Sequence, residues 1–256
     1  MVSREVYHCH PTELTDEQVQ DSIVVESFEP VLDLYLSHPD WGTDIELQAY
    51  FLEVLAERHP QVLEKLRALG LSGQAEVVSF HYSDQIFIAY PRADLEHSLE
   101  MTREVFERYD IPLSRSVFCQ EGQAAPGMAA VMKEHGYEYL IGCASVSMAD
   151  SGHLAASLYG QLSSGPQSRM APEEYRVFPR CPLHLAALRR DLPAEPPPLI
   201  KGYLRAGAWV CGDPAWDPDF NTADLPLLLP MARLSDRYAR HFLGEQGGGG
   251  TSVMNG

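Results

Sequence analysis

The sequence has little positive charge. Its 256 residues include 19 Lys and Arg against 36 Asp and Glu, which gives a formal net charge of −17 at pH 7. Proteins that bind nucleic acid or an anionic membrane surface do so through basic patches. The charge balance therefore argues against either as the main partner of this chain.

Long apolar runs are also missing. No stretch approaches the ~18 consecutive apolar residues that a membrane-spanning helix needs. Residues 1–8 contain no apolar run of the signal-peptide type. We therefore expect a cytoplasmic protein that does not associate with a membrane.

Cysteine is scarce and scattered. The cysteines are odd in number and form no C-x-x-C pair; they are Cys9, Cys119, Cys143, Cys181 and Cys211. This spacing fits reduced thiols better than a disulfide framework.

What is present is the composition of an ordinary globular protein. Hydrophobic residues make up 45% of the chain and charged residues 21%, which excludes a wholly disordered chain. The length suits one large domain or two small ones. We expect one compact or incomplete barrel domain over residues 1–244 and a flexible Gly-rich tail over residues 245–256.

Short apolar strands alternate with amphipathic helices over the first 142 residues. This alternation predicts right-handed βαβ units, and so an α/β fold built on a parallel sheet or barrel. The expected strands are 5–10, 75–80, 116–119 and 137–141, with a short strand or helix lead-in at 44–47, and the expected helices are 17–36, 47–55, 60–69, 94–106 and 127–135.

The periodicity fades after Gly142. Residues 143–175 show only weak helical patterning, and the proline-rich segment 192–198 predicts a stiff linker or a loop. A late strand is expected at 208–211 and a terminal helix at 232–243.

Polar residues cluster directly after three of the expected strands. In parallel α/β folds the functional site lies at the carboxyl ends of the strands, so these clusters mark where a site is expected. They are His8 to His10, Ser79 to Gln85, and Cys119 to Gln123.

Glu121 is the strongest candidate for a functional side chain. It follows an apolar strand, and its neighbours Gln120 and Gln123 can hydrogen-bond a carboxylate or a sugar hydroxyl. Gly122 lets the backbone turn tightly beside it. The alternative is a structural role, in which Glu121 stabilises the N-terminus of the next helix through the helix dipole.

The histidines allow more than one interpretation. His8 and His10 are two residues apart, so on a strand both face the same side, where they can grip a hydroxylated ligand or a metal ion. The absence of a carboxylate at ligand spacing makes the metal the weaker option. His81 and Asp84 can equally be loop anchors, and Trp209 can stack on a sugar ring or pack in the core.

At these clusters the sequence resembles the N-terminal catalytic barrel of glycoside hydrolase family 57, the α-amylase and 4-α-glucanotransferase family. The resemblance covers roughly residues 5 to 142. The matching segments are His8-Cys-His10-Pro11, Leu52-Glu53 through Pro60, Gly73-Gln-Ala-Glu-Val-Val78, Tyr90-Pro-Arg-Ala-Asp94, Glu121 in Phe118-Cys-Gln-Glu-Gly with Pro126, and Glu134-His-Gly-Tyr-Glu-Tyr-Leu-Ile141.

This resemblance implies a distorted (β/α)7 barrel of TIM type and a retaining reaction on an oligo- or polysaccharide of the α-glucan class, without a metal or other cofactor. Glu121 stands at the place of the family nucleophile, and Asp213 is the residue aligned with the acid/base. The expected sugar-binding residues are His8, His10, Glu46, His81, Asp84, Gln120, Gln123 and Trp209.

The chain departs from the family pattern in its second half. The family's Asp pair after the fifth strand is replaced by Gly142 and Cys143, and most of the family's helical C-terminal domain is missing. Two alternatives therefore stay open. One is a carbohydrate-binding homologue without activity, and the other is a metal-dependent polysaccharide deacetylase-like hydrolase that uses His8, His10 and Asp84. The glycosidic linkage and the oligomeric state stay open as well.

Overall fold

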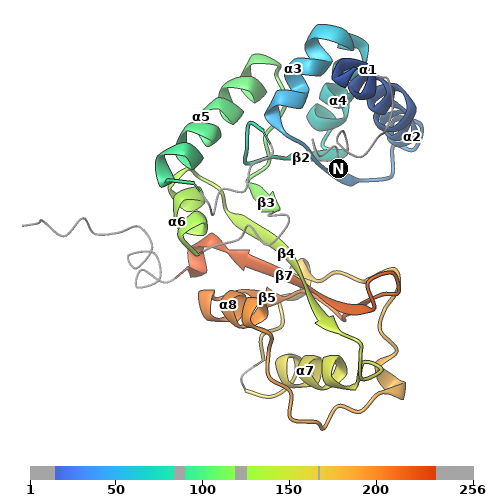
Figure 1. The fold of residues 1–256 in the computed structure, drawn as a ribbon, viewed down its shortest axis with the longest axis vertical. Coiled ribbons are helices and arrows are strands. Elements are labelled where there is room, and N and C mark those ends of the chain that lie inside the picture. The colour runs from blue at the N-terminus through green and yellow to red at the C-terminus, as the bar shows by residue number, and fades with distance from the viewer. Residues whose placement is uncertain (1–14, 84–89, 119–125, 167, 235–256) are drawn as a thin grey trace, which may run out of the picture. The chain divides into compact units, whose positions relative to one another are not determined.

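The computed structural model describes residues 15–83, 90–118, 126–166 and 168–234, and the chain divides into two compact units, Met1–Phe118 and Cys119–Gly256 (Figure 1). The expected strand at 5–10, the tail at 245–256 and most of the expected helix at 232–243 lie outside the described residues. Within the described residues, no helix is long and apolar enough to cross a membrane.

The first unit is built on a short parallel pair of strands. β1 (Thr43–Glu46) pairs with β2 (Ala75–Val78), from Thr43 opposite Ala75 to Glu46 opposite Val78. The helices are α1 (Asp16–Ile23), continued by a π-helical turn (Val24–Phe28) into α2 (Glu29–Ser37), then α3 (Ala49–Arg58), α4 (Pro60–Ser72) and α5 (Arg92–Arg108), followed by β3 (Ser116–Phe118).

Local sequence signals set the ends of these helices. Thr15 caps α1, because its hydroxyl accepts the Gln18 N–H at 3.3 Å while the Gln18 side chain accepts the Thr15 N–H at 2.9 Å. Pro60 occupies the first turn of α4, where its missing N–H costs nothing. Gly73 ends α4 at a φ of +76°, a conformation that favours glycine. The helix therefore starts where the predicted range 60–69 starts and ends three residues later than predicted.

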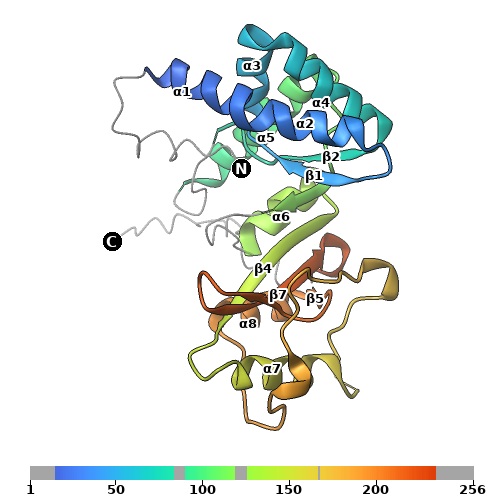
Figure 2. The ribbon, with the colours of Figure 1, turned by 90° about the vertical axis from the view of Figure 1, so that its right-hand side faces the viewer.

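The core of the first unit lies where α2, α3, α4 and α5 meet the strand pair. Figure 2 shows α1 to α4 gathered on one side of β1 and β2. The fully buried side chains of this core come from each of these helices and include Leu32, Leu52, Leu55, Leu66, Leu69 and Phe106. Their spacing of three and four residues within a helix is the amphipathic pattern seen in the sequence.

The second unit contains an antiparallel sheet, which differs from the parallel strands expected throughout. β4 (Tyr139–Ser147) pairs antiparallel with β7 (Thr222–Pro230), and β7 also pairs antiparallel with β5 (Trp209–Val210) and β6 (Ala215–Asp217). The prediction of parallel strands alternating with helices is therefore wrong for this unit. The chain returns through β6 and β7 as a tight hairpin, which only antiparallel strands allow.

One strand of the second unit is longer than expected, and two of its helices were not expected. The strand predicted at 137–141 runs to Ser147 as β4, and α7 (His153–Ser163) lies in the segment with weak patterning. Helix α8 (Pro198–Ala206) starts at the last proline of the expected linker. By contrast, α6 (Pro126–Glu134) and the left-handed Gly136 after it agree with the sequence pattern.

The second unit has its own core, formed by one face of the sheet together with α7 and α8. It includes Ala144 and Val146 of β4, Leu225 and Leu227 of β7, and Ile200 of α8. The residues of each strand alternate, as expected for a sheet with one covered face. Neither the parallel pair nor the antiparallel sheet closes into a barrel within the described residues, and the distorted barrel stays a prediction.

The close approach of the Val177 carbonyl to Gly212 allows a test of the packing of the second unit. A methyl group on its Cα would stand 2.2 Å from the Val177 carbonyl oxygen, whereas one on Gly202 of α8 would meet nothing within 4 Å. We expect Gly212→Ala to lower the free energy of unfolding by about 1–3 kcal/mol. Gly202→Ala should raise it by up to about 1 kcal/mol, since alanine favours a helix. Chemical denaturation measures both, and equal effects would contradict this packing.

Candidate functional site

The carboxyl ends of β1 and β2 lie at one edge, which is held by backbone hydrogen bonds that continue past the strands. The Leu47 N–H donates to the Val78 carbonyl at 3.1 Å, and the Ala49 N–H donates to the His81 carbonyl at 3.2 Å. The Tyr50 N–H then donates to the Tyr82 carbonyl at 2.8 Å. This ladder fixes the segments that carry Glu46 and His81 beside each other.

Two expected sugar-binding residues, Glu46 and His81, belong to this edge. Glu46 is the last residue of β1 and is half-buried, with one carboxylate oxygen enclosed by protein. His81 is only 4% exposed, and its ring meets the Phe80 ring edge-on at 4.4 Å. Among the described residues, His81 Nδ1 has no hydrogen-bond partner. A buried ring nitrogen without a partner is costly to keep, which makes His81 a candidate ligand-binding group.

Burial governs the protonation of His81. Loss of hydration lowers the pKa of its imidazole from 6.5 to about 4, because the charged form is disfavoured away from water. His81 is therefore neutral near pH 7 and offers one N–H donor and one nitrogen acceptor. That pair of functions suits a hydroxyl group of a ligand.

Six other predicted residues of the strand-end clusters, among them the proposed nucleophile, lie outside the described residues. They are His8, His10, Asp84, Gln120, Glu121 and Gln123. Within the described part of the chain, no three His, Cys, Asp or Glu side chains gather to hold a metal ion.

A second polar group of the first unit, centred on Glu53, was not found from the sequence. Tyr82 follows His81, and its hydroxyl donates to Glu53 Oε2 at 2.6 Å. The Arg108 guanidinium donates to Glu53 Oε1 at 2.9 Å. Burial and then the Glu53 carboxylate raise the pKa of Tyr82 to about 12, so it stays a hydrogen-bond donor. The position of Tyr82 directly after a strand was the available signal.

Asp213 lies in the second unit, in the turn between β5 and β6. The Tyr159 hydroxyl of α7 donates to Asp213 Oδ1 at 2.5 Å. Burial, followed by this hydrogen bond, raises the pKa of Tyr159 to about 12. Tyr159 therefore holds the carboxylate in place, and Asp213 remains exposed to solvent.

Two arginines approach Tyr159 from other segments. Arg176 precedes Val177 in the chain. The Val177 carbonyl faces Gly212, and the Val177 N–H donates to the Cys211 carbonyl at 2.8 Å. Arg190 packs its backbone against Gly160, the residue after Tyr159. Both guanidinium groups act on the Tyr159 hydroxyl electrostatically. Tyr159 thus lies near two cationic side chains as well as the Asp213 carboxylate that it contacts.

Trp209, the last predicted sugar-binding residue, packs against protein side chains in the second unit. Its ring centre lies 5.5 Å from that of Tyr175, and the Arg233 guanidinium lies over the ring at 4.9 Å. The Tyr175 and Tyr139 hydroxyls are 3.0 Å apart. Trp209 is half-buried in this cluster, which favours the packing interpretation over stacking on a sugar.

The sequence profile of glycosyl hydrolase family 57 matches residues 7–172 of this chain. The chain belongs to glycosyl hydrolase family 57. The match confirms the resemblance drawn from the strand-end motifs. It extends through the first unit and into the second, and it ends before Trp209 and Asp213.

Individual relatives of this family 57 protein carry two kinds of name. L-ornithine N(alpha)-acyltransferase of Agrobacterium fabrum is 34% identical over 124 residues, which cover 46% of this chain and 42% of the relative. Alpha-amylase 1 of Dictyoglomus thermophilum is 22% identical over 116 residues, or 45% of this chain and 17% of the relative. Each match thus covers less than half of the relative's length.

A solved structure is also similar to the family 57 chain. The crystal structure of 4-alpha-glucanotransferase from Thermococcus litoralis matches at 18% sequence identity with a TM-score of 0.47. The match covers 61% of this chain and 23% of the solved one.

The low pKa of His81 predicts a pH-dependent stability. Between pH 6.5 and about 4 the unfolded imidazole binds a proton and the folded one does not, so folding stability falls as the pH drops through this window. The difference is on the order of 3 kcal/mol. In denaturation series at pH 7, 5.5 and 4, His81→Gln should reduce the slope of the free energy of unfolding against pH. The control His97→Gln, at an exposed position of α5, should leave that slope unchanged. An unaltered slope in His81→Gln would refute the buried neutral imidazole.

Proposed function

We propose that this protein cleaves or transfers α-glucosidic bonds with retention of configuration, using Glu121 as the nucleophile. Membership of glycosyl hydrolase family 57 carries the proposal, because it suggests a glycosidase or transferase of α-glucans. The names of an α-amylase and a 4-alpha-glucanotransferase among the proteins of similar sequence support the substrate class. The buried polar atoms of Glu46 and His81 at the strand edge support their proposed role as sugar-binding residues.

The proposed reaction is a double displacement. The Glu121 carboxylate attacks the anomeric carbon and forms a glycosyl-enzyme while the bond to the leaving oxygen breaks and a carboxylic acid protonates that oxygen. Water or a sugar hydroxyl then attacks the anomeric carbon, the bond to Glu121 breaks, and the second carboxylate takes the proton. Such a pair has its carboxyls ~5–5.5 Å apart.

Asp213 is the proposed acid/base, and the predicted binding residues are proposed to hold sugar hydroxyls. Tyr159 positions the Asp213 carboxylate, which supports an ordered role. Asp213 lies beyond the part of the chain that the family profile matches, so a different carboxyl group is the natural competitor. The compact or incomplete barrel domain over residues 1–244 belongs to the same proposal, as do the alternatives of an inactive carbohydrate-binding homologue and a metal-dependent deacetylase-like hydrolase.

The nucleophile is tested by Glu121→Gln on maltooligosaccharides. The amide cannot form the glycosyl-enzyme, so kcat should fall by at least about 10³-fold. The matched control is Glu104→Gln, which makes the same change at an exposed position of α5 and should keep full turnover. Full activity of Glu121→Gln would rule out this nucleophile. Inactivity of the unaltered protein on every α-glucan would favour the binding homologue.

A second candidate function is acyl transfer to the α-amino group of an amino acid. The observation that favours it is the 34% identity to L-ornithine N(alpha)-acyltransferase, which is higher than the identity to the amylase. An activated acyl donor such as a thioester would lose its thiolate, and the amine nitrogen would form the amide bond and release a proton. Asp213 with Arg176 and Arg190 offers opposite charges for an amino acid's ammonium and carboxylate groups.

The second candidate is tested by incubating the protein with ornithine and a long-chain acyl thioester and measuring N-acylornithine by mass spectrometry. Asp213→Asn should lower the yield at least about tenfold, because it removes the charge that binds the ammonium group. Asp219→Asn, in the neighbouring exposed turn, should not. Absence of N-acylornithine with the unaltered protein rejects this function, and loss of glucan turnover alone in Asp213→Asn assigns Asp213 to glycosyl transfer.

A further inference from the structure

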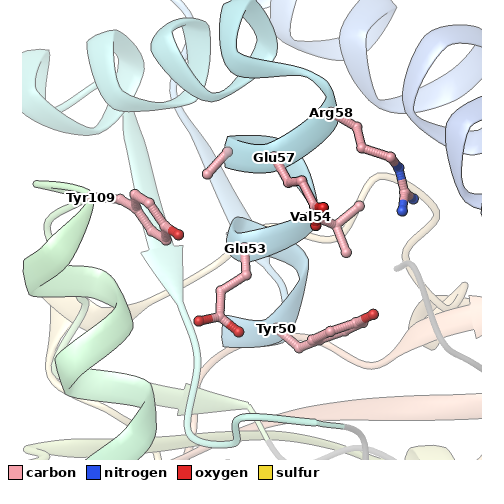
Figure 3. A pocket seen from close by; sticks show the side chains of 7 residues that line it. Tyr50, Glu53, Val54, Glu57, Arg58 and Tyr109 are labelled. Atoms are coloured by element: carbon pink, nitrogen blue, oxygen red, sulfur yellow. The ribbon is translucent and has the colours of Figure 1, made fainter.

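A pocket of about 440 Å³ opens on one face of α3, within the first unit. Its lining comes from α3 and from the residue after α5, and comprises Tyr50, Glu53, Val54, Ala56, Glu57, Arg58 and Tyr109 (Figure 3). The α3 residues recur at intervals of three and four, so they share one side of the helix. The volume falls in the range of pockets that hold small molecules.

Aromatic rings provide the apolar walls of this pocket. Figure 3 shows Tyr109 and Tyr50 on either side of Glu53. Tyr50 is 42% exposed, and its ring lies edge-on to the Tyr82 ring with the centres 6.1 Å apart. The backbone of Tyr50 is fixed by its N–H bond to the Tyr82 carbonyl. Exposed tyrosine faces held in place attract cations through the ring quadrupole.

Most charged side chains that line the pocket already have hydrogen-bond or ion-pair partners within the protein. Glu53 accepts hydrogen bonds from Tyr82 and Arg108, one on each carboxylate oxygen. The Arg58 guanidinium donates to Asp21 Oδ1 at 2.8 Å and to Gln20 Oε1 at 2.5 Å. Figure 3 shows Arg58 and Tyr109 at opposite ends of the pocket. Arg58 therefore does not neutralise the other carboxylates of the pocket.

Glu57 is the charged pocket residue that has no ion-pair partner in the described part of the chain. Its side chain is exposed, and among the described residues it has no hydrogen bond or ion pair. The first unit as a whole carries eight Lys and Arg against 22 Asp and Glu. Such an excess of negative charge draws cations toward the surface and repels anions. Binding a neutral sugar here would remove water from Glu57 without supplying a positive charge.

We propose that this pocket binds a small organic cation, with its ammonium group on Glu57 and its carbon body between Tyr50 and Tyr109. The ammonium group donates to the free carboxylate, and the tyrosine rings cover the adjoining methylene groups. The site shares Tyr50 with the strand-end ladder but includes neither Glu46 nor His81. Its ligand binding does not depend on the proposed glycosidase or acyltransferase activity.

Calorimetric titration of the whole protein with butylammonium at low salt tests the site, with 1-butanol and maltose as neutral comparisons. Butylammonium should bind, and Glu57→Gln should weaken its affinity about tenfold or more. Tyr50→Ala should also weaken it, since part of the apolar wall is lost. Glu104→Gln, which removes the same charge from α5, should change the affinity less than about twofold. Added salt should weaken binding.

The variants are expected to fold, because Glu57, Tyr50 and Glu104 are exposed, and circular dichroism melts verify this. Absence of butylammonium binding overturns the proposal, as does equal affinity in Glu57→Gln and the unaltered protein. Binding of maltose or butanol that is lost in Tyr50→Ala and kept in Glu57→Gln also overturns it, because the pocket would then select neutral ligands.

Discussion

The parallel pairing of β1 with β2 is the constraint on which the first unit depends. Two strands 32 residues apart in the chain, Thr43 opposite Ala75, come into register across α3 and α4, and such a crossover requires a helical connection that packs back on the strands. The buried leucines of α3 and α4 supply that packing. The backbone ladder then extends to His81 and Tyr82, so one register sets both the strand edge and the Glu53 hydrogen bonds.

The second unit differs from the first in how its strands pair. Its sheet is antiparallel, its core is separate, and the family 57 profile ends within it at residue 172. The amylase match and the acyltransferase match each cover less than half of the chain. The charge is also uneven, because 22 of the 36 acidic residues fall in the first unit. Two functions are proposed because the relatives carry two kinds of name.

The sequence predicted elements with strong local signals and missed those set by tertiary contacts. Pro60 stands at the predicted start of α4, whereas the helix ends at Ser72 rather than at the predicted residue 69. Strand β7 was missed because Pro226 and Pro230 interrupt it, yet the Pro226 carbonyl still accepts the Cys211 N–H at 2.8 Å. The sequence indicated His81 as a candidate site residue because it follows a strand, but it did not show that the side chain is buried. The partner of Asp213, Tyr159, is 54 residues away, a contact that local patterns do not encode.

The claim that Glu121 forms a covalent glycosyl-enzyme is tested most directly by trapping that intermediate. A 5-fluoroglucosyl fluoride forms the intermediate readily and slows its hydrolysis, so peptide mass spectrometry can locate the sugar. The proposed mechanism predicts one fluoroglucosyl adduct on the peptide that contains Glu121, and no adduct in Glu121→Gln. An adduct on a different carboxylate, or turnover of an α-glucan with no adduct on Glu121, would contradict it.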